Sequence, residues 1–70
     1  MSKASNQNIL IPRKRLYSLK EAGEYLGRPV WGIRELIWSG KIPVIQDGRK
    51  MYLDINDLDA YIDRFKRTEI

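Results

Sequence analysis

Cysteine and histidine are both absent from this chain of 70 residues. Without cysteine the chain has neither a disulfide nor a thiolate nucleophile, and without histidine it lacks the commonest general base. The usual ligands of structural zinc are missing for the same reason. We therefore expect a protein that is not an enzyme, that uses no metal and no cofactor, and that has no small-molecule ligand.

Long apolar runs are absent as well. The apolar cluster nearest the N-terminus, residues 9–11, is far too short to cross a bilayer. Residues 1–8 are polar and lack the apolar stretch of a signal peptide. The chain is therefore expected to be cytoplasmic, with no membrane partner.

The net charge of +4 is placed unevenly along the chain. The excess comes from residues 1–16, which carry no acidic side chain and four basic ones: Lys3, Arg13, Lys14 and Arg15. This pattern predicts a flexible basic arm over residues 1–15, followed by a folded domain over residues 16–67. A basic arm suits a polyanion such as DNA, because neutralising phosphates releases counterions. A solubilising tail is the alternative.

Two closely spaced helices are predicted by the residues at their ends. Ser18 and Glu21 form a capping-box pattern at the start of the first helix, residues 18–26, and Gly27 suits a left-handed cap at its end. The second helix, residues 29–39, has Pro29 in its first turn, where the missing N–H is not needed. At about 100° per residue, this helix has two faces. The expected buried face holds Val30, Ile33, Leu36 and Ile37, and the opposite face holds Trp31, Arg34, Glu35 and Trp38.

A hairpin and a third helix complete the expected order of elements. Two β-prone runs over residues 43–53 flank Asp47-Gly48, which favours a tight turn because both residues tolerate positive φ. Asp54 is a good N-cap for a helix over residues 54–66. The residues expected to be buried along this third helix are Ile55, Leu58, Tyr61, Ile62 and Phe65.

This order predicts an α+β fold, a small winged helix-turn-helix with three helices, a two-stranded β-hairpin wing and the flexible basic arm. In that geometry the second helix enters the major groove of DNA and the first helix supports it. Arg49 and Lys50 lie at the wing tip, where they can reach a phosphate or a minor groove. A three-helix domain with an incidental hairpin is the alternative.

From Tyr17 to Ile62 the sequence resembles the excisionase family of MerR-like winged helix-turn-helix domains. The matching segments are Tyr17-Ser18-Leu19-Lys20-Glu21-Ala22, Tyr25-Leu26-Gly27, Ile33, Leu36-Ile37, Ser39-Gly40-Lys41-Ile42-Pro43, Gly48-Arg49-Lys50 and Asp57-Leu58-Asp59-Ala60-Tyr61-Ile62. The resemblance implies binding of double-stranded DNA through the second helix and the wing. It also implies a role as a recombination directionality or architectural factor of a mobile element, with an integrase or neighbouring copies as partners. The sequence departs from the family pattern at Pro29, Trp31, Gly32, Glu35 and Trp38.

The candidate DNA-contacting residues are Arg28, Trp31, Arg34, Arg49 and Lys50, together with Arg13, Lys14 and Arg15 of the arm. Arg34 is the clearest of them, because arginine can form a bidentate pair with guanine; pairing with Glu24 or Glu35 is the alternative. Arg28 can touch a phosphate near the start of the second helix; an ordinary residue of the turn, without a functional contact, is the alternative.

The two tryptophans are assigned different environments. Trp31 is expected to contact a partner, whereas Trp38 is expected to fold into the core. Two functions besides the excisionase-like one stay open. One is a small transcriptional repressor of the same fold. The other is a protein-interaction module that uses the face formed by Trp31, Glu35 and Trp38.

Overall fold

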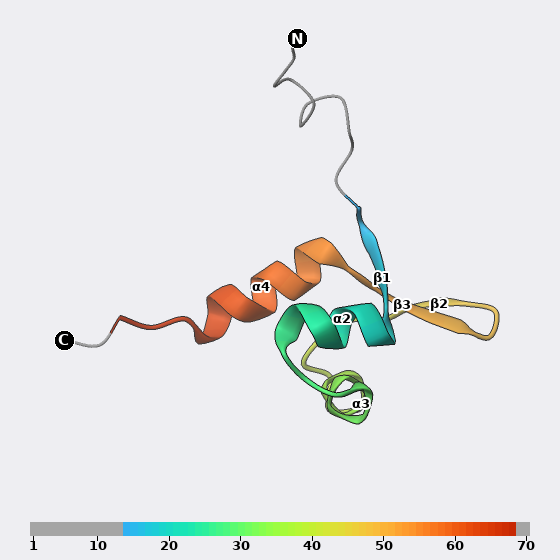
Figure 1. Cartoon of the computed structure of the whole chain (residues 1–70), viewed down its shortest axis with the longest axis horizontal. Helices are drawn as coiled ribbons and strands as arrows, with labels where there is room; N and C mark the ends of the chain where they lie inside the picture. Colours follow the sequence, from blue (N-terminus) through green and yellow to red (C-terminus); the bar gives the residue numbers. More distant parts are fainter. Residues whose placement is uncertain (1–13, 69–70) are drawn as a thin grey trace, which may run out of the picture.

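The computed structural model describes residues 14–68, and Figure 1 shows how its helices and strands are arranged. In chain order the elements are β1 (Leu16–Ser18), α2 (Leu19–Leu26), α3 (Val30–Trp38), β2 (Ile45–Asp47), β3 (Lys50–Asp54) and α4 (Ile55–Phe65). In this view α3 lies below α2, the β2–β3 hairpin extends to the right and α4 extends to the left. This arrangement confirms the predicted α+β winged helix-turn-helix fold.

The ends of α2 are held by the side chains and backbone that the sequence indicated. The Ser18 hydroxyl accepts a hydrogen bond from the backbone N–H of Glu21 at 3.1 Å. The Glu21 carboxylate in turn accepts one from the backbone N–H of Ser18 at 2.9 Å. Gly27 caps the other end in the left-handed region, at φ 72°. Glycine is favoured there because a side chain would strain that conformation.

The start of α3 differs by one residue from the prediction. Pro29 is the N-cap, in extended conformation with ψ 165°, and it is not part of the first turn. Its carbonyl accepts hydrogen bonds from the backbone N–H groups of Gly32 and Ile33. The three-residue turn of the helix-turn-helix is therefore Gly27-Arg28-Pro29. The helix ends as expected, where Ser39 is the C-cap and Gly40 has φ 75°.

The hairpin turn also lies one residue further along the chain than expected. Asp47 pairs with Lys50 across the antiparallel ladder, so Gly48 and Arg49 are the two central turn residues. Gly48 takes the positive φ, at 63°. The strand before the turn begins at Ile45 and not at Pro43. Proline has no N–H to donate to a ladder, which disfavours an earlier start.

A third strand, β1, extends the predicted two-stranded wing into a three-stranded sheet. The strand order is β1-β3-β2, and β1 pairs antiparallel with β3, Leu16 opposite Asp54 and Ser18 opposite Tyr52. The pairing joins residues almost forty positions apart in the chain. A three-residue strand carries too little periodicity to be recognised locally, which explains why the sequence did not reveal it.

The core lies where α2, α3, β3 and α4 meet. Its buried residues are Ala22, Ile33, Leu36, Ile42, Leu53, Ile55 and Leu58. Val30, which was expected to be buried on α3, is instead 37% exposed. Val30 is the first residue of α3 and directly follows the connecting turn. Ile42, from the loop after α3, was not predicted to be buried, but it fills part of the core.

The second half of α4 extends past the core, so the predicted buried stripe was wrong for its last two members. Ile62 is 36% exposed and Phe65 is 58% exposed, whereas Ile55 and Leu58 are buried. Figure 1 shows the end of α4 projecting to the left of α2, beyond the elements that cover its start. Between residues 14 and 68, none of the helices has the length and apolar character needed to cross a membrane.

Candidate nucleic-acid interface

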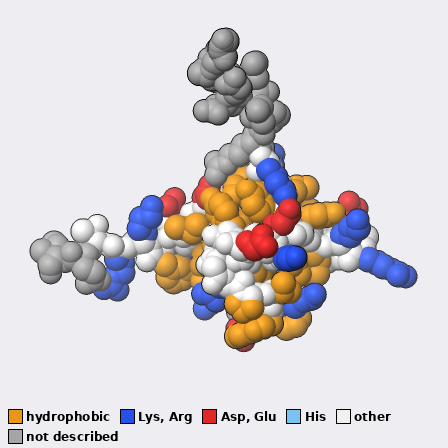
Figure 2. Space-filling view, in the orientation of Figure 1, with side chains coloured by type: hydrophobic (Ala, Val, Ile, Leu, Met, Phe, Trp, Pro, Cys, Tyr) orange, Lys and Arg blue, Asp and Glu red, His pale blue; other side chains and the backbone are white. Residues whose placement is uncertain are grey.

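The outward face of α3 carries two indoles. Ile33 and Leu36 turn inward to the core, which leaves the opposite side of the helix to solvent. Trp31 is 66% exposed and Trp38 is 75% exposed. The expectation that Trp38 belongs to the core was therefore wrong. With three quarters of its surface exposed, Trp38 is not covered by the hairpin or by α4. Figure 2 shows hydrophobic side chains gathered at the lower edge of the molecule, over α3.

Arg34 lies on the same outward face of α3 and is exposed. Among residues 14–68 it forms no ion pair and no hydrogen bond with a side chain, so the alternative pairings with Glu24 and Glu35 are not made. Its guanidinium is thus available to a ligand that approaches α3. The outward residues of α3 are Trp31, Arg34, Glu35 and Trp38, the four that the helical spacing placed together.

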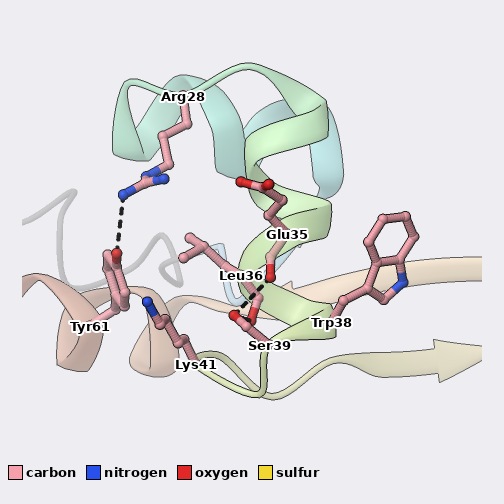
Figure 3. A pocket seen from close by; sticks show the side chains of 7 residues that line it. All are labelled: Arg28, Glu35, Leu36, Trp38, Ser39, Lys41 and Tyr61. Atoms are coloured by element: carbon pink, nitrogen blue, oxygen red, sulfur yellow. Dashed lines mark hydrogen bonds between the residues drawn. The ribbon is translucent and has the colours of Figure 1, made fainter.

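Arg28, in the turn before α3, is exposed, and its guanidinium is directed toward α4. Its Nη2 donates a hydrogen bond to the Tyr61 hydroxyl at 3.2 Å, and its guanidinium carbon lies 5.9 Å from the centre of the Tyr61 ring. Figure 3 shows Arg28 and Tyr61 on one side of a hollow that is also lined by Glu35, Leu36, Trp38, Ser39 and Lys41. In this view the indole of Trp38 points away from Tyr61. Arg28 therefore lines the same hollow as Trp38 and Glu35, but its guanidinium is held by Tyr61 of α4.

The wing tip presents its two cations to solvent. Gln46 braces the turn, because its side-chain amide donates to the Gly48 carbonyl at 2.9 Å. Arg49 and Lys50 are both exposed, and neither forms an ion pair within the described part of the chain. Figure 2 shows basic side chains at the right-hand end of the molecule, where the hairpin of Figure 1 ends.

Lys14 and Arg15, predicted to form the end of a flexible arm, contact the folded domain. Lys14 pairs with the Glu21 carboxylate and lies 5.1 Å from the centre of the Tyr17 ring. Arg15 pairs with Asp54 at 2.9 Å, and its carbonyl accepts from the backbone N–H of Ile55. These residues directly precede β1, whose start lies on the far side of α2 from α3 in Figure 1. They are therefore not brought together with α3, and Arg13 lies outside the described residues.

The pKa values of two carboxyl groups reflect these contacts. The hydrogen bond from Lys14, and then the one from the backbone N–H of Ser18, lower the pKa of Glu21. The backbone N–H of Asn56, and then Arg15, lower the pKa of Asp54. Both carboxylates are therefore stabilised in their ionised form, which favours the contacts that hold residues 14 and 15 against the domain.

Gly23 and Arg64 make contacts that fix the segments on either side of α3, and neither residue was predicted to have this role. Gly23 is buried in α2, and the Arg28 carbonyl packs against the place where its side chain would be. Arg64 donates to the Lys41 carbonyl at 3.0 Å, which ties α4 to the loop after α3. A glycine inside an amphipathic helix is the one signal in the sequence that could have indicated the first contact. Nothing in the local sequence pointed to the second.

One comparison with known proteins gave a match. A family model described as a helix-turn-helix domain matches residues 16–66, which include all the strands and helices described above. Comparison with curated proteins and with solved structures gave no match.

Proposed function

This chain belongs to the helix-turn-helix domain family, which implies that it binds double-stranded DNA, and from that premise we propose a sequence-specific mode of binding. In this proposal α3 lies in the major groove, and the β2–β3 hairpin contacts the backbone or the minor groove of the same duplex. The chain acts by binding and not by catalysis, which its lack of histidine and cysteine supports.

The observation that carries the proposal is the unpaired Arg34 on the outward face of α3. A guanidinium that is exposed and has no ion pair in the described chain keeps its donors free for the O6 and N7 atoms of guanine. Arg49 and Lys50 add two exposed cations at the wing, where phosphate contacts fix the register of a protein on DNA.

Selection from a pool of duplexes with a randomised centre tests this proposal. The full chain is mixed with the pool, bound duplexes are recovered over several rounds, and the enriched sequences are read. We expect one recurring motif, and binding to it that weakens steeply with added salt. A pool that stays random, or binding that does not depend on salt, would overturn the proposal. The Arg34→Ala variant is the matched control, and it is expected to enrich a motif with one position relaxed.

For the biological role we propose an excisionase-like architectural factor, because the helix-turn-helix family includes excisionase-like domains. Several copies bind side by side and bend the DNA, and an integrase docks on the assembly. The exposed apolar end of α4 supports this role. Phe65 packs against Tyr61 with the two rings tilted and their centres 4.9 Å apart, and more than half of the Phe65 surface faces solvent. Such a surface suits contact with a neighbouring copy or an integrase better than it suits an isolated domain.

Bending of the selected duplex separates this role from that of a transcriptional repressor. Migration of circularly permuted fragments at saturating protein measures the bend directly. We expect a bend, cooperative occupation of adjacent sites and stimulation of an integrase reaction. Straight DNA with no effect on the integrase would instead identify a repressor.

A protein-interaction module is the second candidate function, and the exposure of Trp38 favours it more than the sequence did. On that reading the face formed by Trp31, Glu35 and Trp38 docks on a protein. Replacing both tryptophans by alanine distinguishes the two functions. Loss of DNA affinity supports the DNA-binding role, whereas unchanged DNA affinity with loss of self-association supports the interaction module.

A further inference from the structure

Trp31, Arg34 and Trp38 form a row along the outward face of α3, and we refer to these three residues as the α3 row. The two indoles are separated by two helical turns, or about 10 Å along the helix axis. Arg34 lies between them. Both indoles are mostly exposed, so each has a large apolar surface that no other part of residues 14–68 covers.

The spacing of this row matches the spacing of bases in a duplex. Successive bases of one strand are about 3.4 Å apart along the helix axis of DNA. A helix that lies along the major groove therefore brings Trp31 and Trp38 to base pairs about three steps apart. Arg34 then faces a base pair between them.

Chemistry restricts what the indoles can meet in the groove. The edges of the base pairs there consist of hydrogen-bond donors and acceptors, and their largest apolar group is the C5-methyl of thymine. An indole that packs on this methyl removes apolar surface of both partners from water, which favours binding. Packing on any other base edge removes a polar group from water and is disfavoured.

The polar residues of the same face have partners in the same groove. Arg34 can donate to guanine, and the carboxylate of Glu35 can accept from the amino group of cytosine. All four outward side chains of α3 thus find chemically matched groups in a G·C pair flanked by thymines. A protein partner would need an apolar surface for the two indoles and also an acidic group for Arg34. The major groove of DNA already offers both apolar methyl groups and acceptors for a guanidinium, so we favour DNA as the partner of this face.

We propose that Trp31 and Trp38 read thymine methyl groups. The DNA site of this protein then holds two thymines about three base pairs apart, each packed on one indole, with a guanine that pairs with Arg34 between them. This inference rests on the proposed function, because it requires α3 to lie in the major groove.

Uracil in place of thymine tests the inference, because it removes the methyl group and leaves the hydrogen-bonding edge unchanged. The probe is the duplex enriched from the randomised pool, resynthesised with uracil at one thymine at a time. We expect affinity to fall about fourfold at each of two positions, as the loss of one buried methyl group predicts. Uracil at the other thymines should have no effect.

Variants assign each methyl group to one indole. With Trp31→Ala, uracil at one of the two positions should no longer lower the affinity, and with Trp38→Ala the same should hold for the other position. Leu16→Ala, an exposed apolar residue on β1 away from α3, is the control and should keep both uracil effects.

The outcomes separate this inference from the function on which it rests. If no duplex is enriched, the proposed function fails and the inference fails with it. If a duplex is enriched but uracil has no effect at any position, the inference is overturned while the proposed function stands. If the uracil effects persist in both tryptophan variants, the assignment to Trp31 and Trp38 is overturned.

Discussion

Gly23 and Arg28 touch through their backbones, and this contact holds the two helices of the helix-turn-helix together. The backbone N–H of Arg28 donates to the Gly23 carbonyl at 2.8 Å. The Arg28 carbonyl packs so closely against Gly23 that no Cβ fits there. The turn Gly27-Arg28-Pro29 can therefore fold back directly onto α2, and this sets where α3 leaves it.

Gly23→Ala and Gly32→Ala should have opposite effects on stability. Alanine normally stabilises a helix relative to glycine by about 1 kcal/mol. At Gly23 the new methyl group meets the Arg28 backbone, so we expect a net loss of about 1–3 kcal/mol in the free energy of unfolding. At Gly32 the nearest atom, Arg28 Cβ, is 3.5 Å away, which is ordinary contact, so we expect a gain. Chemical denaturation of both variants measures this difference. An equal gain in the free energy of unfolding in both variants would show that helix propensity alone governs both sites.

Arg34→Ala and Lys50→Ala should weaken DNA binding in different ways. Loss of a bidentate pair with guanine costs about 1–3 kcal/mol of discrimination at one base pair. Loss of a phosphate contact instead weakens binding to all sequences and reduces the slope of log affinity against log salt by about 1. Titrations of the enriched duplex and its single-base variants at several salt concentrations measure both effects. An unchanged preference in Arg34→Ala would show that this residue does not read a base.

Trp38→Ala should leave the stability of the fold almost unchanged. With 75% of its surface exposed, this side chain contributes little to the core, and we expect a change within about 0.5 kcal/mol. Leu36→Ala is the matched control, since Leu36 is 4% exposed and a buried leucine costs about 2–5 kcal/mol on truncation. Thermal unfolding of both variants measures the contrast. A large loss in Trp38→Ala would place that indole in the core after all.

The stability of the domain should depend on pH through Asp54. Because its pKa is lowered in the native state, Asp54 stabilises the fold fully above the ordinary carboxyl pKa of about 3.9. That contribution is lost as the pH falls through the lowered native pKa. Asp54→Asn keeps an N-cap acceptor and removes the charge, so its stability should fall less over this acidic range. Denaturation at a series of pH values compares the two proteins. Identical curves would show that the ionised carboxylate adds nothing beyond capping.

The sequence could predict the features that depend only on residues close together in the chain. The capping box at Ser18, the left-handed Gly27 and the N-cap at Asp54 all act within one turn of a helix, and all are confirmed. The outward set on α3 follows from helical periodicity alone. These local signals were enough to give the fold and the element that carries the candidate site.

The remaining features depend on packing between residues far apart in the chain. The pairing of β1 with β3, the contact of Arg28 with Tyr61 and the folding of Arg15 onto Asp54 join residues that are more than thirty positions apart. The exposure of Trp38, Ile62 and Phe65 depends on how far the neighbouring elements reach, because an apolar stripe becomes core only where another element covers it. The sequence determined which faces were apolar, and the tertiary structure decided which of them stayed open to a partner.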